Sequence, residues 1–169
     1  MPLRKQIRPE SKRRYADLKL APALVPKPLW GLSAYRLLSR GASWRQIRGD
    51  TLQAAGHRCS ICGQPAGRLT CHERWDYRDA TGLAVLIGLD ARCDLCDAAT
   101  HMGRAAAHGN RQIALTQLCR VNRIGRAEAL EIFEGEMALW KARSHRRWRV
   151  AVDGELLRRY PQLRVLLPA

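Results

Sequence analysis

Two Cys-x-x-Cys knuckles decide the fold of this chain: Cys59-Ser60-Ile61-Cys62 and, after 30 intervening residues, Cys93-Asp94-Leu95-Cys96. Four thiolates at this spacing are typical of a tetrahedral zinc site in a protein whose cysteines stay reduced. A glycine follows the second cysteine and suits the tight turn of a knuckle. We therefore predict that one structural Zn²⁺ ion is bound by Cys59, Cys62, Cys93 and Cys96.

Further ligand-type residues lie close to the knuckles. The run Cys71-His72-Glu73-Arg74-Trp75 stands between them, and Asp97 and His101 follow the last knuckle cysteine. Imidazole and carboxylate groups are harder ligands than thiolates and suit a second divalent ion that performs chemistry. Asp97 and His101 are spaced to share one helical face. Asp97 also has a structural interpretation, because an acidic residue in a first helical turn satisfies free amides.

The composition favours an intracellular protein that contacts polyanions. The 169 residues carry a formal net charge of +15. Thirteen Lys and Arg oppose three acids in residues 1–58, four oppose six in residues 59–103, and thirteen oppose six in residues 104–169. Basic flanks suit phosphates, and an acidic centre suits a divalent cation. No apolar run approaches the roughly 20 residues of a membrane span, and no signal-peptide core is present, so we expect a cytoplasmic location.

The basic residues predict a nucleic-acid partner, with double-stranded DNA favoured. Arginine offers a bidentate fork to phosphates and to guanine edges, and most of the cationic side chains are arginines. A strongly basic face could also be merely solvated. The residues that we predict to contact nucleic acid are Arg4, Lys5, Arg13, Arg14, Arg104, Arg143, Arg146 and Arg147.

The sequence pattern divides the chain into four parts. Prolines and a charge run predict an extended, mobile arm over residues 1–28, and residues 29–56 predict a helical lead-in in which Ser43 caps the second helix and Gly56 ends it. Residues 57–109 form the zinc core. Residues 110–169 predict helices at 110–121 and 126–144 packed as a hairpin, a short strand at 148–152 and a peripheral basic tail.

Within the zinc core, the pattern predicts a strand at residues 67–72, a loop at 75–82 and one continuous helix at 97–107. The apolar run at residues 83–89 fits either a partner strand or a buried connection. The expected fold class is therefore α+β and mainly helical, with a small zinc-stapled core.

The order of these motifs resembles the HNH endonuclease superfamily, which has the ββα-metal fold. The resemblance rests on Cys-x-x-Cys-Gly, then Leu-x-Cys-His-Glu-x-Trp-x-Tyr, then a second Cys-x-x-Cys with a histidine five positions after it. It is most specific over residues 59–104, and it is closest to the bacterial and phage branch with a His-Glu-x-Trp motif. The resemblance implies that His72 and Glu73 are catalytic, and that His72, Asp97 and His101 bind Mg²⁺ or Mn²⁺.

Some positions depart from the pattern of that superfamily. The usual general base is a histidine, whereas Glu73 occupies the aligned position; His72 as the base with Glu73 as a ligand is the alternative. Asp97 stands where a histidine is usual, and residues 81–84 contain no counterpart of the middle asparagine.

The resemblance implies a metal-dependent DNA endonuclease that leaves 3′-hydroxyl and 5′-phosphate ends. The departures support a second hypothesis, a catalytically inactive zinc-stabilised module for DNA binding or assembly. A homodimer or larger assembly is compatible with either hypothesis.

Overall fold

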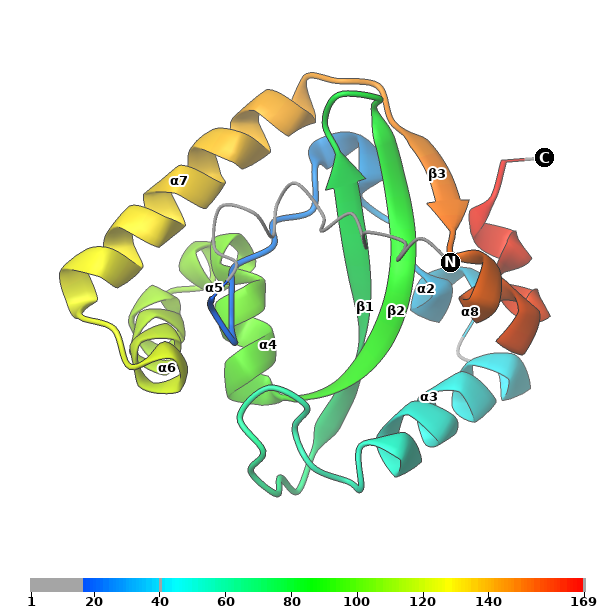
Figure 1. Ribbon diagram of the computed structural model, residues 1–169, viewed down its shortest axis with the longest axis horizontal. Helices are drawn as coiled ribbons and strands as arrows, with labels where there is room; N and C mark the ends of the chain where they lie inside the picture. Colours follow the sequence, from blue (N-terminus) through cyan, green and yellow to red (C-terminus); the bar gives the residue numbers. More distant parts are fainter. Residues whose placement is uncertain (1–16, 40, 169) are drawn as a thin grey trace, which may run out of the picture.

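The computed structural model describes residues 17–39 and 41–168. They form an α+β fold in which a three-stranded sheet lies between two groups of helices (Figure 1). No helix in these described ranges is both long enough and apolar enough to cross a membrane. In chain order, the elements are η1 (Lys27–Leu29), α2 (Ala34–Leu37), α3 (Ala42–Ala54), β1 (Leu69–Arg78), β2 (Leu83–Cys93), α4 (Asp94–Thr100), α5 (Met102–Ala107), α6 (Arg111–Asn122), α7 (Arg126–Ser144), β3 (Arg149–Val152), α8 (Gly154–Arg159) and η2 (Pro161–Leu166).

The centre of the fold is an antiparallel hairpin of β1 and β2 that leads directly into α4. The pairing runs from Leu69 opposite Cys93 to Arg78 opposite Leu83, with an irregularity between Arg74 and Trp75. The apolar run at residues 83–89 is thus a strand. The loop predicted for residues 75–82 is wrong over its first half, because β1 continues to Arg78. The predicted short strand near the C-terminus is confirmed, since β3 pairs with β2 in parallel.

Two apolar cores lie on either side of the hairpin. One packs α4 to α7 against the sheet around Met102, Leu115 and Leu118, and the other packs α2, α3 and the C-terminal segment around Ile47, Leu86 and Leu163. Figure 1 shows these two groups of helices flanking β1 and β2. Burial on both faces places the hairpin, and the ligand-type residues on it, in the interior of the fold.

The mobile N-terminal arm and the peripheral C-terminal tail that the sequence predicts are packed against the fold where the structure describes them. Within the predicted arm, residues 17–28 carry Leu20, Leu24 and Pro26 into the interior, and Asn122 binds the backbone of Leu20 through its amide. At the other end, Tyr160 and Leu163 are buried in the second core, so the C-terminal segment is not peripheral. Both differences arise because sparse apolar residues spaced along a polar segment bury themselves on an existing surface.

The helices near the knuckles match their predicted positions more closely. Gly56 has a φ of +58° and ends the lead-in helix as predicted. The N-cap of α3 is Gly41, however, and the predicted cap Ser43 lies inside the helix. The α6 and α7 helices have the predicted limits and are joined by a short turn at Arg123 to Gly125, which makes them the predicted hairpin.

Candidate metal centres

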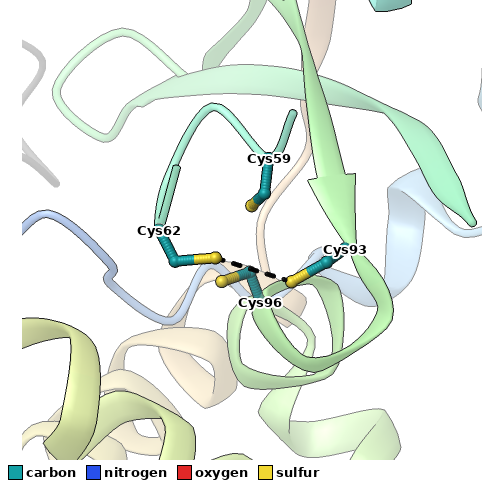
Figure 2. A group of neighbouring side chains, drawn as sticks. All are labelled: Cys59, Cys62, Cys93 and Cys96. Atoms are coloured by element: carbon teal, nitrogen blue, oxygen red, sulfur yellow. Dashed lines mark hydrogen bonds between the residues drawn. The ribbon is translucent and has the colours of Figure 1, made fainter. Parts of the chain in front are cut away.

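The four knuckle cysteines converge on one point. Cys59 and Cys62 come from the loop before β1, Cys93 ends β2, and Cys96 lies in the first turn of α4; Figure 2 shows their side chains turned toward one another. All four sulfur atoms lie within 4.8 Å of one another, and those of Cys62 and Cys93 are 3.9 Å apart. Tetrahedral Zn–S bonds of about 2.3 Å require sulfur separations of about 3.8 Å. The cluster therefore has the composition and dimensions of a zinc site.

The backbone of the first knuckle is fixed to the hairpin. The amide of Ser60 donates to the carbonyl of Ala91 over 2.8 Å, and the amide of Ala91 donates to the Ser60 hydroxyl over 3.2 Å. Gly63 has a φ of +72°, which permits the tight turn after Cys62. From α6, the buried amide of Gln117 donates to Cys96 Sγ over 3.0 Å. Neighbouring elements thus orient the ligands before any ion is bound.

The ionisation of the thiols is consistent with a cluster that could hold a cation. Burial opposes ionisation of Cys59, but backbone amides at Cys62, Cys93 and Ile61 lower its pKa to about 7. Burial raises the pKa of Cys96 far above its ordinary value, and the Cys59 thiolate raises it further. A divalent cation would supply the charge that holds several thiolates together.

A second cluster unites three of the predicted catalytic residues. His72 Nδ1 on β1 lies 3.2 Å from Asp97 Oδ1 on α4, and His101 Nε2 lies 3.7 Å from the same oxygen. The two imidazole rings have centres 5.0 Å apart. One ligand atom from each of these three residues falls within 4.8 Å of the others, so the group could hold a metal ion. From the solvent side, the Arg104 guanidinium donates to Asp97 Oδ2 over 2.9 Å.

This cluster combines one carboxylate with two neutral imidazoles at neutral pH. Burial lowers the pKa of His72, and burial together with the nearby His72 lowers the pKa of His101 to about 4. Burial alone would raise the pKa of Asp97, but the hydrogen bond with His72 and the charges of His101 and Arg104 lower it to about 2. All three side chains therefore have free electron pairs for a metal at neutral pH, and no proton must leave first.

The helix that carries Asp97 and His101 is broken, which corrects the continuous helix predicted for residues 97–107. His101 has φ −92° and ψ 44°, and it stands between the end of α4 and the start of α5. The amide of His101 still donates to the Asp97 carbonyl over 2.9 Å, so the one-turn spacing of the two side chains survives. The break lies at His101 itself and does not separate its side chain from that of Asp97.

Glu73 is not part of this cluster, although it lines the same groove, so its role as a base or ligand stays a prediction. Adjacent residues of a strand point to opposite faces, and His72 takes the face toward α4. Glu73 Oε1 accepts from the amide of Ala34 over 2.8 Å at the start of α2, and its Oε2 accepts from Trp75 Nε1 over 3.2 Å. Burial raises its pKa. Both carboxylate oxygens are thus used to fix α2 to β1.

Sequence reasoning missed a buried network behind the cluster. Asp90 lies opposite His72 in the hairpin and accepts two bonds from the Arg92 guanidinium, at 2.8 and 3.1 Å. Arg92 also contacts the hydroxyl of Thr100, and that hydroxyl donates to the Cys96 carbonyl over 2.9 Å. The i, i+2 spacing of Asp90 and Arg92 could have revealed the network only with the strand and its register already assigned. It connects β2 to the helix that supplies ligands to both clusters.

A groove of about 680 Å³ opens over the second cluster. His72, Asp97 and His101 line it, together with three exposed arginines, Arg48, Arg68 and Arg104, and two further acidic residues, Glu73 and Asp94. The groove therefore places cations around a potential metal site, which suits an anionic substrate.

The predicted nucleic-acid contacts have different outcomes. Arg104 lies at the groove, and Arg146 and Arg147 are exposed near the end of α7 and after it. Arg143 is buried, and its guanidinium forms an ion pair with Asp79 in which Nη2 lies 2.6 Å from Oδ2. Arg143 therefore has a structural role. This corrects its prediction as a phosphate contact. Arg4, Lys5, Arg13 and Arg14 lie outside the described residues.

Comparisons of the chain with protein-family models, with curated proteins and with solved structures found no match. The two clusters and the groove are the features of the described residues that point to a function.

Proposed function

We propose that this protein is a metal-dependent endonuclease whose active site is the cluster of His72, Asp97 and His101. The observation that carries the proposal is the convergence of these three side chains, from β1, α4 and the residue that follows α4, in a groove lined by three arginines. A β-hairpin followed by a helix supplies the residues, which is the order that the resemblance to HNH endonucleases implies. The cysteine cluster would be the structural zinc site that holds hairpin and helix together.

The donor set fits a divalent ion bound by Asp97 and His101. One carboxylate, one neutral imidazole and positions left for water or phosphate oxygen suit Mg²⁺ or Mn²⁺, which retain waters in such sites. When bound, the ion would supply Lewis acidity to the departing oxygen of a phosphodiester.

His72 is the base in this proposal. Its Nδ1 is held by Asp97, which leaves Nε2 as the second basic nitrogen, and its lowered pKa keeps the ring neutral and able to accept a proton from the attacking water. The proposal does not use Glu73 as the base, because both of its oxygens accept hydrogen bonds, from the Ala34 amide and the Trp75 indole.

The arginines at the groove would bind the phosphates. Arg48 and Arg68 flank the start of β1, and Arg104 contacts Asp97 while remaining largely exposed, with 63% of its side-chain surface accessible. Arg104 could therefore reach a phosphate beside the ion.

The test is nicking of supercoiled plasmid in Mn²⁺ or Mg²⁺, with Mn²⁺ binding measured in parallel by electron paramagnetic resonance. His101→Ala should lose both nicking and Mn²⁺ binding, whereas His72→Ala should lose nicking and keep Mn²⁺ binding. His108→Ala is the matched control, because His108 is an exposed histidine that follows α5. Equal, background-level nicking by the wild type and all variants would refute the endonuclease.

Two observations favour a second function, a zinc-stabilised DNA-binding module without catalysis. The residue at the base position, Glu73, serves the fold, and Asp97 is already paired with Arg104 and His72. DNA binding without nicking, and without a change of affinity in His101→Ala, would support this alternative.

A further inference from the structure

Two tryptophans near the groove stack on each other, and one of them is largely exposed. Trp30 follows η1 and is 63% exposed. Its ring stacks on that of Trp140 from α7, with ring centres 6.4 Å apart and an angle of 21° between the planes. A tryptophan with most of its surface in water contributes little burial energy, so the core gives little reason for its position.

Both indoles are fixed by the same acceptor. Trp30 Nε1 donates to the carbonyl oxygen of Val25 over 2.9 Å, and Trp140 Nε1 donates to the same oxygen over 3.0 Å. One carbonyl with two lone pairs can accept both bonds. The exposed ring is therefore held in one orientation, which lowers the entropy lost when a flat ligand stacks on it.

One cationic side chain lies against the pair, and two residues close to it in the sequence line the groove. The Lys27 ammonium lies 5.4 Å from the centre of the Trp140 ring. Val25 and Leu29, which bracket Lys27 in the sequence, line the same groove as His72, Asp97 and His101. Aromatic rings combined with positive charge are the means by which proteins bind unpaired nucleobases and the phosphates between them.

We propose that Trp30 and Trp140 form a stacking platform for an unpaired nucleobase of the DNA strand that occupies the groove. The preferred substrate is then DNA with a single-stranded nucleotide next to the bound phosphodiester, such as a tailed or locally open duplex. This inference rests on the proposed function, because the groove must accept nucleic acid.

The test is fluorescence anisotropy of labelled DNA with the full chain, in buffer without Mg²⁺ or Mn²⁺ so that no strand is cut. Three probes share one duplex: a blunt form, a form with a short single-stranded tail, and a form whose tail carries abasic sites with the same number of phosphates. We expect the wild type to bind the tail with bases about 5-fold or more tightly than the abasic tail.

Trp30→Ala should reduce that ratio to less than about twofold and leave the affinity for the abasic tail unchanged, since only stacking is lost. Trp30→Phe should retain most of the ratio. Ile113→Ala is the matched control, because Ile113 is a 50% exposed apolar residue on α6. Thermal melting of each variant verifies that it is folded.

Equal affinities of the wild type for the two tails would overturn the platform, as would an equal loss of affinity for both tails in Trp30→Ala. If either result were found and the wild type still nicked plasmid, the stacking platform would be refuted and the proposed endonuclease activity would be retained. Base-dependent binding without nicking in Mn²⁺ would leave the platform standing and refute the endonuclease.

Discussion

Arg143 offers a sharp prediction, because the sequence assigns it to DNA and the structure assigns it to the fold. Its guanidinium makes contacts of 2.6, 2.9 and 3.2 Å with the carboxylate of Asp79 in the β1–β2 turn, and it lies 5.1 Å from the ring centre of Tyr77. Its side chain is 4% exposed, and that of Asp79 is 27% exposed. The pair thus ties the end of α7 to the tip of the hairpin.

The expected loss of stability on removing Arg143 follows from the burial of this ion pair. Removal of one partner of a fully buried ion pair costs about 3–5 kcal/mol, and water reaching the partly exposed Asp79 reduces that penalty. We expect Arg143→Ala to lower the free energy of unfolding by about 2–3 kcal/mol, which is a fall of roughly 5–10 °C in Tm for a chain of this size.

Urea unfolding and DNA binding by anisotropy measure the two roles separately. Arg147→Ala is the matched control, because Arg147 is exposed, and it should change stability by less than about 0.5 kcal/mol while weakening DNA binding. A double-mutant cycle with Asp79→Ala isolates the energy of the pair. If Arg143→Ala costs less than about 1 kcal/mol and weakens DNA binding as Arg147→Ala does, the assignment of Arg143 to the fold is wrong.

Three further predictions concern the clusters. Metal analysis after dialysis against EDTA should find one tightly held zinc per chain, and Cys96→Ser should release it and unfold the protein; a zinc-free, folded wild type would contradict this. Glu73→Gln keeps one acceptor for two donors, so the free energy of unfolding should fall by about 1–3 kcal/mol with nicking retained, whereas lost nicking at unchanged stability would place Glu73 in the active site. The pKa of His101 is lowered to about 4 in the folded state, so the unfolded chain takes up a proton at this residue at a higher pH than the folded protein does. The contribution of neutral His101 to the free energy of unfolding is therefore present above pH 6.5 and is lost as the pH falls toward 4. The stability of the wild type relative to His101→Asn should thus fall by about 2–3 kcal/mol over that range, and a constant difference would refute the shift.

The sequence predicts the parts of the fold that local patterns control. The knuckle spacing brings Cys59, Cys62, Cys93 and Cys96 together, and the apolar periodicity of α6 and α7 predicts their limits. The strand that continues through residues 75–78 was missed, because its β structure depends on pairing with β2 rather than on its own residues. Burial of residues 17–28 was missed for a similar reason, since the surface that they cover is assembled from distant helices.

The candidate site shows the same division between local and tertiary information. The i, i+4 spacing predicts that Asp97 and His101 lie together, and the order of motifs brings His72 to them. Glu73 follows His72 directly and lines the same groove, yet its carboxylate binds an amide of α2, a contact that only the tertiary structure creates. Arg143 and Arg147 stand in the same basic run, but Arg143 lies in the last turn of α7 and is buried, whereas Arg147 follows the helix and is exposed.

Anomalous diffraction at the manganese edge, from crystals grown with Mn²⁺, tests most directly the claim that the second cluster is a metal-dependent active site. We predict one Mn²⁺ peak in the groove, about 2.0–2.3 Å from a carboxylate oxygen of Asp97 and from a nitrogen of His101. His72 should lie beside this ion without binding it. An empty cluster, with Asp97 still paired to His72 and Arg104 at saturating Mn²⁺, would contradict the account.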